Sequence, residues 1–251
     1  MEDNLNEYRF LINSQKLENQ KSHDLYIQLN REFSNCVDVK IVNVTLCNSF
    51  YNISSELKNN YFEYRDVKTN TTKYITLEDG LYNIGSYMHF VNKKFNRNPF
   101  KISISSETGK LKIRFPPDIY NLIIRKNLFE MFGIKSNNTY ILDSSGRFVS
   151  EKPAQMLPFT HFNIYSNLID YTKNIEAGNN TSSNSGLLTV LPLKGVKEFG
   201  TQINYNLSEC DFKPCISKFN SIVLKILDHN GNPIDLNNFP VTYEIVVRCR
   251  K

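Results

Sequence analysis

The side chains best suited to chemistry are four histidines and five cysteines, and their spacing along the chain limits what they can do. They are His23, His89, His161 and His229, and Cys36, Cys47, Cys210, Cys215 and Cys249. No histidine lies at metal-ligand spacing from another histidine or a cysteine. Cys210 and Cys215 form a C-x4-C pair without a second such pair, whereas a structural zinc site needs four ligands. We therefore expect no metal site. An odd number of cysteines in a chain of this length is not typical of a disulfide scaffold, so we also expect five free thiols.

Catalytic motifs are also lacking in the sequence. It contains no GxSxG elbow, no phosphate-binding P-loop and no GxGxxG fingerprint. The DSSG segment at 143–146 has the composition of a turn, and the paired acids Glu78 and Asp79 lie in a turn context. We assign no catalytic, cofactor-binding or metal residue and expect a protein that is not an enzyme. A hydrolase on a β-sandwich leaves little trace in sequence, so it stays as an alternative.

Composition and charge narrow the class of protein further. The 251 residues are 40% hydrophobic and carry a net charge of +5, which is mildly basic. A dedicated nucleic-acid binder has a stronger basic signature. The basic clusters are interpreted as solvated faces, with weak contact to a genome or to an acidic neighbouring subunit as the alternative. These clusters are Lys93, Lys94 and Arg97; Arg125 and Lys126; and Arg248, Arg250 and Lys251.

The sequence shows neither a signal peptide nor a membrane-spanning segment, and two of its segments are expected to be flexible. The N-terminal MEDNLNEYRF is polar and does not resemble a signal peptide. No apolar run approaches the roughly 20 residues that span a bilayer, so no membrane insertion is expected. Residues 1–22 are expected to form a flexible N-terminal arm, and the Asn/Ser-rich segment 171–186 an exposed loop.

The elements that would position these residues are mainly β-strands. The C-terminal stretch 219–250 shows the clearest period of two, in which Ile222, Leu224 and Ile226 share one face and Tyr243 and Ile245 another. The DHNGNP segment between these runs contains Asn230-Gly231, which is typical of a tight turn with positive φ. We expect a hairpin that pairs 222–227 with 241–248.

Further strands are expected over ranges distributed along the whole chain: 24–30, 36–48, 71–77, 101–117 as a hairpin, 159–169, 187–193 and 201–207. A short helix is expected within 81–96, capped by Ser86, and a second one before Gly133. The basic residues of 110–114 are assigned to a sheet edge or a solvent face. Many short strands without βαβ alternation predict a sandwich or a jelly roll.

The order of several segments resembles a known family. ITLEDGLYNIGSYMHFVNKKF (75–95), KISISSETGKLKIRF (101–115), NLFEMFGI (127–134), FTHFNIYSNLIDYT (159–172) and NSIVLKILDHNGNPIDLNNFPVTYEIVVR (220–248) follow one another along the chain. This succession is similar to the penton-type minor capsid proteins of Polinton (Maverick) elements, virophages and related adenovirus-lineage viruses.

The resemblance implies an all-β fold, namely an antiparallel single jelly-roll sandwich over 23–251 with one or two short helices in an elaboration around 85–134. It implies a homopentamer that closes the fivefold vertices of an icosahedral capsid, with a double jelly-roll major capsid protein as partner. It implies no catalysis and no cofactor. The protein would be made in the host cytoplasm, assembled in cytoplasm or nucleus, and located in the virion. A monomeric β-sandwich that binds a ligand or receptor is the alternative.

Overall fold

Two compact units make up the chain. The computed structural model describes residues 5–18, 20–94, 101–114, 120–124, 128–135, 140–141, 146–170, 186–193 and 198–251. Unit 1 comprises Met1–Phe50 and Phe159–Lys251, and unit 2 comprises Tyr51–Pro158. Unit 2 is therefore inserted into the sequence of unit 1. The expected exposed loop at 171–186 lies, apart from Gly186, outside the described residues.

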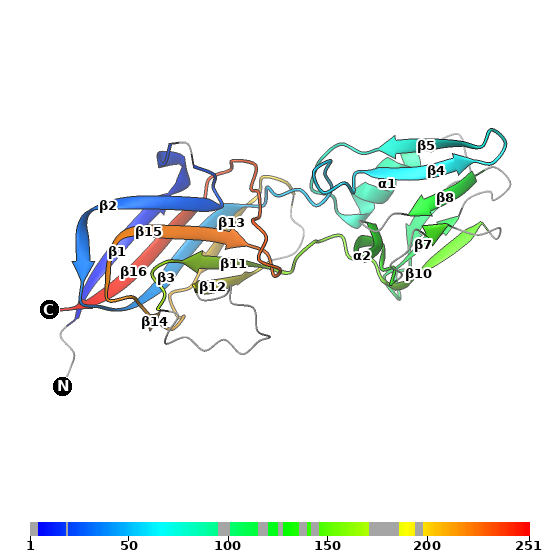
Figure 1. Ribbon diagram of the computed structural model, residues 1–251. Helices are drawn as coiled ribbons and strands as arrows, with labels where there is room; N and C mark the ends of the chain where they lie inside the picture. Colours follow the sequence, from blue (N-terminus) through cyan, green and yellow to red (C-terminus); the bar gives the residue numbers. More distant parts are fainter. Residues whose placement is uncertain are drawn as a thin grey trace. The chain divides into compact units, whose positions relative to one another are not determined.

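Unit 1 is a sandwich of two antiparallel sheets (Figure 1). One sheet has the order β1-β16-β3-β13, with the two-residue β14 also pairing with β3, and the other has the order β12-β11-β15-β2. The elements of this unit are β1 (Leu5–Asn13), the 3-10 turn η1 (Ser14–Lys16), β2 (Asp24–Ser34), β3 (Cys36–Cys47), β11 (His161–Ser166), β12 (Leu187–Pro192), β13 (Gln202–Asn206), β14 (Lys213–Pro214), β15 (Lys218–Leu227) and β16 (Thr242–Arg250).

The order of these strands is that of a jelly roll. With β14 set aside, four strands remain in each sheet. The first strand of the unit pairs with its last, the second with the second-last, the third strand β3 with β13, and β11 with β12. This succession of nested pairs is what results when one long hairpin is wrapped into two facing sheets. The expected all-β, antiparallel single jelly roll is therefore confirmed.

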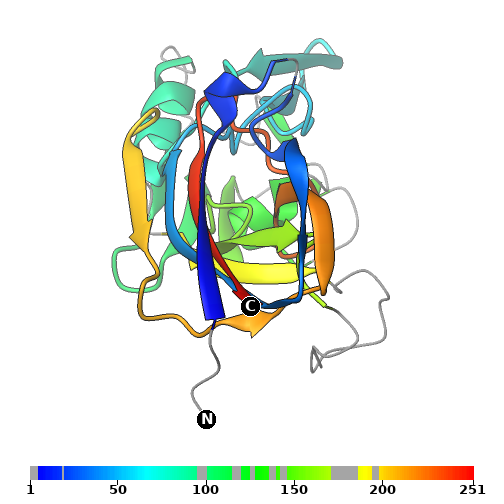
Figure 2. The same ribbon diagram turned by 90° about the vertical axis from the view of Figure 1, so that its left-hand side faces the viewer.

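The N-terminal residues are not the flexible arm that was expected over 1–22. Residues Leu5–Asn13 form β1, which pairs with β16 along its whole length, from Leu5 opposite Arg250 to Asn13 opposite Thr242 (Figure 2). The apolar residues Tyr8, Phe10 and Ile12 alternate with Glu7, Arg9 and Leu11, and this is the period of a strand. The prediction of a flexible arm was wrong because the apolar residues of this run, although few, have the spacing of a strand.

The two C-terminal strands exist, but they do not pair with each other. Gly231 has a φ of 82°, as predicted for the turn. β15 pairs with β11 and β2, whereas β16 pairs with β1 and β3, so the expected hairpin between 222–227 and 241–248 is wrong. Period two reports only that one face of a strand is buried. β15 and β16 each bury one row of alternating apolar side chains in the sandwich. The sequence pattern is therefore the same whether the two strands share a sheet or lie in different sheets.

Unit 2 contains two smaller antiparallel sheets and two helices. The sheets have the orders β10-β7-β6 and β5-β4-β8-β9. Its elements are β4 (Tyr61–Asp66), β5 (Thr71–Thr76), α1 (Ile84–Lys94), β6 (Lys101–Ile104), β7 (Lys110–Arg114), β8 (Tyr120–Ile124), α2 (Phe129–Phe132), β9 (Tyr140–Ile141) and β10 (Arg147–Pro153). The expected elaboration around 85–134 is thus the middle of a larger insertion, and the expected single domain over 23–251 is divided into two units.

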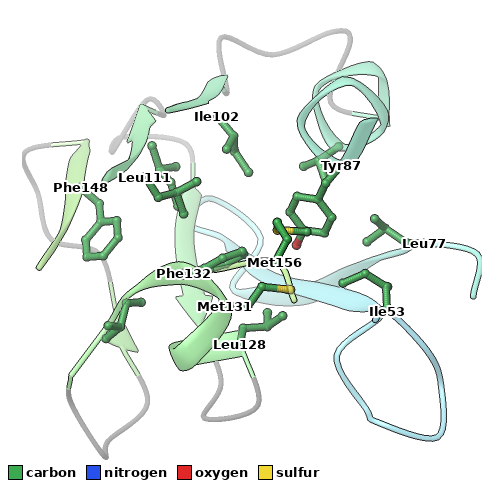
Figure 3. Packing of buried hydrophobic residues seen from close by; sticks show 13 residues of the cluster. Ile53, Leu77, Tyr87, Ile102, Leu111, Leu128, Met131, Phe132, Phe148 and Met156 are labelled. Atoms are coloured by element: carbon green, nitrogen blue, oxygen red, sulfur yellow. The ribbon is translucent and has the colours of Figure 1, made fainter. Parts of the chain in front are cut away.

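A separate hydrophobic core holds unit 2 together. Figure 3 shows buried side chains from α1, the β10-β7-β6 sheet and the α2 region converging on one cluster, with Tyr87, Phe132 and Met156 near its middle. The cluster also includes Ile102 and Leu111 of the β6–β7 hairpin. A core of its own is the physical requirement for a domain that folds independently.

The first helix of unit 2 begins earlier than its predicted cap. α1 starts at Ile84, and the Oδ1 atom of Asn83 accepts a 2.8 Å hydrogen bond from the backbone N–H of Ser86. Asn83 therefore fills the capping role that the sequence assigned to Ser86. The Ser86 hydroxyl instead donates to the backbone carbonyl of Asn83.

Candidate interaction surfaces

The residues whose side chains could take part in catalysis or metal binding are dispersed or have structural roles. Within the described ranges, no group of three or more His, Cys, Asp or Glu side chains is arranged to hold a metal. His161 and His229, far apart in sequence, bring their ring centroids to 6.4 Å, a pairing that spacing could not predict. Asp79 accepts hydrogen bonds from the backbone N–H and the hydroxyl of Ser55, so this acid stabilises a turn as expected. The DSSG residues 143–145 lie outside the described residues.

All five cysteines are free thiols in this structure. Cys210 is exposed, whereas Cys36, Cys215 and Cys249 are buried. Burial, with the adjoining Cys249 thiol, raises the pKa of Cys36 well above its ordinary value, and burial raises the pKa of Cys215 to about 12. The thiols of Cys36 and Cys215 therefore stay protonated at neutral pH and are not activated nucleophiles.

One side of the sandwich is formed by β1 and β2. Tyr8 and Phe10 of β1 place their ring centroids 5.0 and 5.3 Å from that of Phe33 on β2, and Phe33 stacks on Phe219. The guanidinium of Arg31 lies 4.6 Å from the centre of the Phe33 ring. β1 and β2 each have one strand partner in the sheets of the described chain. Leu11 on β1 is 75% exposed, which is unusual for a leucine in a strand.

The opposite side of the sandwich is formed by β12 and β13. The hydroxyl of Tyr205 on β13 donates to the backbone carbonyl of Pro192 on β12, so the two strands face each other across the sheets. Each ends its sheet, and Val190 on β12 is 45% exposed. Both sides therefore present strand edges together with an exposed apolar side chain. Unpaired edges of this kind are available for contact with another chain.

Part of the β2 edge is already protected. The side-chain amide of Gln20 donates to the backbone carbonyl of Tyr26 and accepts from its backbone N–H. This side chain satisfies the two backbone groups that a neighbouring strand would otherwise use. Contact with another chain on this side is consequently expected at β1 and at side chains, and not by pairing at Tyr26.

The basic groups are less available than their clusters in the sequence indicate. Arg248 forms a two-pronged ion pair with Asp38, through Nε to Oδ1 at 2.7 Å and through a second contact, which raises the pKa of Arg248. Its guanidinium lies 3.7 Å from the centre of the Phe212 ring, and the Lys40 ammonium lies 4.6 Å from the same ring. Arg248 thus has a structural role on the sheet that contains β16 and β3, whereas Arg250 and Lys251 are exposed.

The basic strand at 110–114 lies on a solvent face but not at an edge. β7 is the middle strand of its sheet, between β6 and β10. Lys112 and Arg114 are exposed, whereas Leu111 and Ile113 between them are fully buried. The edge interpretation was wrong, because the alternation of lysine with apolar residues reports which face is solvated and not how many neighbours the strand has.

A shallow hollow of about 460 Å³ lies on β4 and β5 of unit 2, lined by Tyr61, Glu63, Tyr74 and Thr76. The rings of Tyr61 and Tyr74 meet edge to face with centroids 6.0 Å apart, and Tyr74 is 58% exposed. Glu63, directly opposite Tyr74, is only 5% exposed. Two tyrosines beside a carboxylate are suited to a polar or cationic ligand. The register between β4 and β5 assembles these residues, and no spacing within one segment indicates it.

The fold defines an all-β, single jelly-roll protein with an inserted unit between its third and fourth principal strands. No protein-family model matches the sequence, and no curated protein matches it. Among solved structures, the chain is similar to a selenomethionine-labelled mavirus penton protein, with 11% sequence identity and a TM-score of 0.49. The similarity covers 97% of this chain and 98% of that chain.

Proposed function

We propose that this chain is a penton-type minor capsid protein that assembles as a homopentamer. The observation that carries the proposal is a single jelly roll whose two sides both end in edge strands, β1 and β2 on one side and β12 and β13 on the other. When one side of a copy contacts the other side of the next copy, the contact is head-to-tail. Repetition of such a contact closes into a ring if the rotation between neighbours divides a full turn.

The partners follow from the same proposal. A ring at a fivefold vertex would contact a double jelly-roll major capsid protein, and the protein would reside in the virion after assembly in the host cytoplasm or nucleus. Contact with the genome would be weak, because Arg248 is already paired with Asp38. No described helix has the length and apolar character needed to cross a bilayer.

The first test is the mass of the purified full-length protein. Light scattering coupled to gel filtration should give five copies of the 29.2 kDa chain, about 146 kDa. A particle that stays at the mass of one chain at high protein concentration would overturn the pentamer.

We predict that lysine at either exposed apolar edge residue breaks the ring. Leu11→Lys places a charge on the β1 side and Val190→Lys places one on the β12 side, and each should weaken assembly at least about tenfold, because a buried charge without a partner is costly. Leu57→Lys, at an exposed leucine of unit 2, is the matched control and should assemble as the wild type does. Sedimentation velocity measures all three.

Mixing the two edge variants tests the head-to-tail geometry itself. Each variant retains the side that the other has lost, so a mixture can form one good contact but cannot propagate it. The expected product is a pair of two 29.2 kDa chains, about 58 kDa, which neither variant forms alone. A mixture that remains monomeric, or edge variants that still form full rings, would contradict the proposed contact.

A second candidate function is supported by the hollow on β4 and β5. Its tyrosines and Glu63 would allow unit 2 to bind a polar or cationic ligand as a monomeric module. A monomeric wild type that binds an immobilised glycan or amine array, and loses binding on Tyr74→Ala, would favour this function over the capsid role.

A further inference from the structure

Two buried thiols in unit 1 lie almost within bonding distance of each other. The Sγ atoms of Cys36 on β3 and Cys249 on β16 are 3.0 Å apart, and both side chains are buried. A disulfide bond is about 2.05 Å long, so closing the gap requires a movement of about 1 Å. The two residues are separated by 213 positions in the sequence, and for this reason spacing gave no sign of the pair.

The backbone around the pair also has the geometry that a disulfide needs. Cys249 is the ladder partner of Cys36 between β3 and β16, just past a β-bulge that places Arg248 opposite Asp38. The backbone N–H of Arg250, the residue after Cys249, donates to the carbonyl of Asn35, the residue before β3 begins. This pattern flanks a non-hydrogen-bonded pair, in which the Cα atoms approach to about 4.5 Å and the side chains are closest. That separation lies within the range of about 4.4–6.8 Å that disulfides span.

We propose that Cys36 and Cys249 form an oxidative cross-link site, which joins the last strand of the sandwich to β3 when the protein meets a peroxide. One thiol is oxidised by hydrogen peroxide to a sulfenic acid, with release of water. The partner sulfur then attacks the sulfenic sulfur, and a second water leaves. In total, two thiols lose two electrons and two protons, and one peroxide becomes two waters.

The reaction is expected to be slow and selective. Because burial raises the pKa of Cys36, the thiolate that attacks peroxide is scarce at neutral pH. The bond should therefore form over hours under excess oxidant and should be absent in a reducing cell interior. Cys215 is the nearby competitor, since its ionisation is coupled electrostatically to both other thiols. The inference does not depend on the proposed capsid function.

The test is peptide mapping of the full-length chain after peroxide treatment at pH 8 and alkylation under non-reducing conditions. Trypsin should release residues 32–40 joined to the dipeptide 249–250, a product that disappears on reduction. Exposed Cys210 should also be oxidised, which confirms that the oxidant acted. Cys215→Ser should retain the cross-link, whereas Cys249→Ser should abolish it.

The cross-link should also raise the melting temperature of unit 1. Constraining a loop of this length typically stabilises a chain of this size enough to raise Tm by about 5–10 °C, reversed by reductant. The Cys249→Ser variant should show no shift under the same treatment. Oxidised Cys210 without a link between Cys36 and Cys249, or a link from either of them to Cys215 in the wild type, would overturn the proposal.

Discussion

Gly133→Ala is expected to unfold unit 2 while unit 1 remains folded. Gly133 has a φ of 71°, and a Cβ atom placed there would lie 2.2 Å from the backbone oxygen of Lys152. That oxygen belongs to β10, and the N–H of the same residue donates to the Gly133 carbonyl at 2.9 Å, so the strand cannot retreat without losing this bond. The left-handed backbone and the overlap together should cost about 2–5 kcal/mol.

Gly231→Ala is the matched control for this substitution. Gly231 has a φ of 82°, but nothing lies within 4 Å of the position that its Cβ would take. Only the backbone penalty of about 1–2 kcal/mol applies there, and it falls on unit 1. Hydrogen exchange measured by mass spectrometry should show faster exchange in 101–153 for Gly133→Ala, with 219–250 unchanged. Equal losses of stability in the two variants would refute this account of Gly133.

Asn52→Ala should cause the other large loss of stability. Asn52 is 2% exposed, and its amide donates to the backbone carbonyls of Tyr82 at 2.7 Å and Met156 at 2.8 Å. Its Oδ1 atom accepts from the N–H of Tyr82 at 2.7 Å. Alanine would leave these backbone groups without their partner in a buried setting, which should cost about 3–5 kcal/mol in the free energy of unfolding.

Two further variants determine whether the hydrogen bonds are the cause. Asn52→Asp keeps the size and one acceptor but directs a carboxylate at two carbonyl oxygens, so it should be at least as damaging as alanine. Asn220→Ala, at an exposed position of β15, should change stability by no more than about 0.5 kcal/mol. Urea denaturation followed by circular dichroism compares the three. A loss below about 1 kcal/mol for Asn52→Ala would show that water replaces the amide.

The sequence predicted those parts of the fold in which one strand face is buried. Residues 36–48, 101–117 and 201–207 alternate between apolar and polar residues, and each contains a strand of the structure. Gly231 has a positive φ value, as predicted for its turn. In these segments, local pattern and tertiary structure agree, because burial on one side of a pleated strand produces alternation whatever the partner is.

The features that sequence reasoning missed depend on which strands become neighbours. The alternation in 222–227 and 241–248 is compatible with a hairpin or with separate sheets, and only the wrapping of the whole chain separates these cases. The hollow of Tyr61 and Tyr74 and the thiol pair of Cys36 and Cys249 are likewise made by register between strands. No spacing within one segment reports such contacts, and an alignment of related sequences would be needed to detect them.

The amide of Asn52 has one more consequence, which concerns how such a chain could evolve. It holds residue 52 to residue 156, and so the entry and exit of the insertion stay side by side through contacts that unit 2 makes itself. The insertion of more than a hundred residues therefore connects β3 to β11 as one short loop with fixed ends would. A segment of that kind can be lengthened, exchanged or deleted without a change in the strand order of the sandwich. The sequences of unit 1 and unit 2 are therefore free to diverge at different rates. Strand pairing within the sheets restrains unit 1, and binding partners of the insertion restrain unit 2.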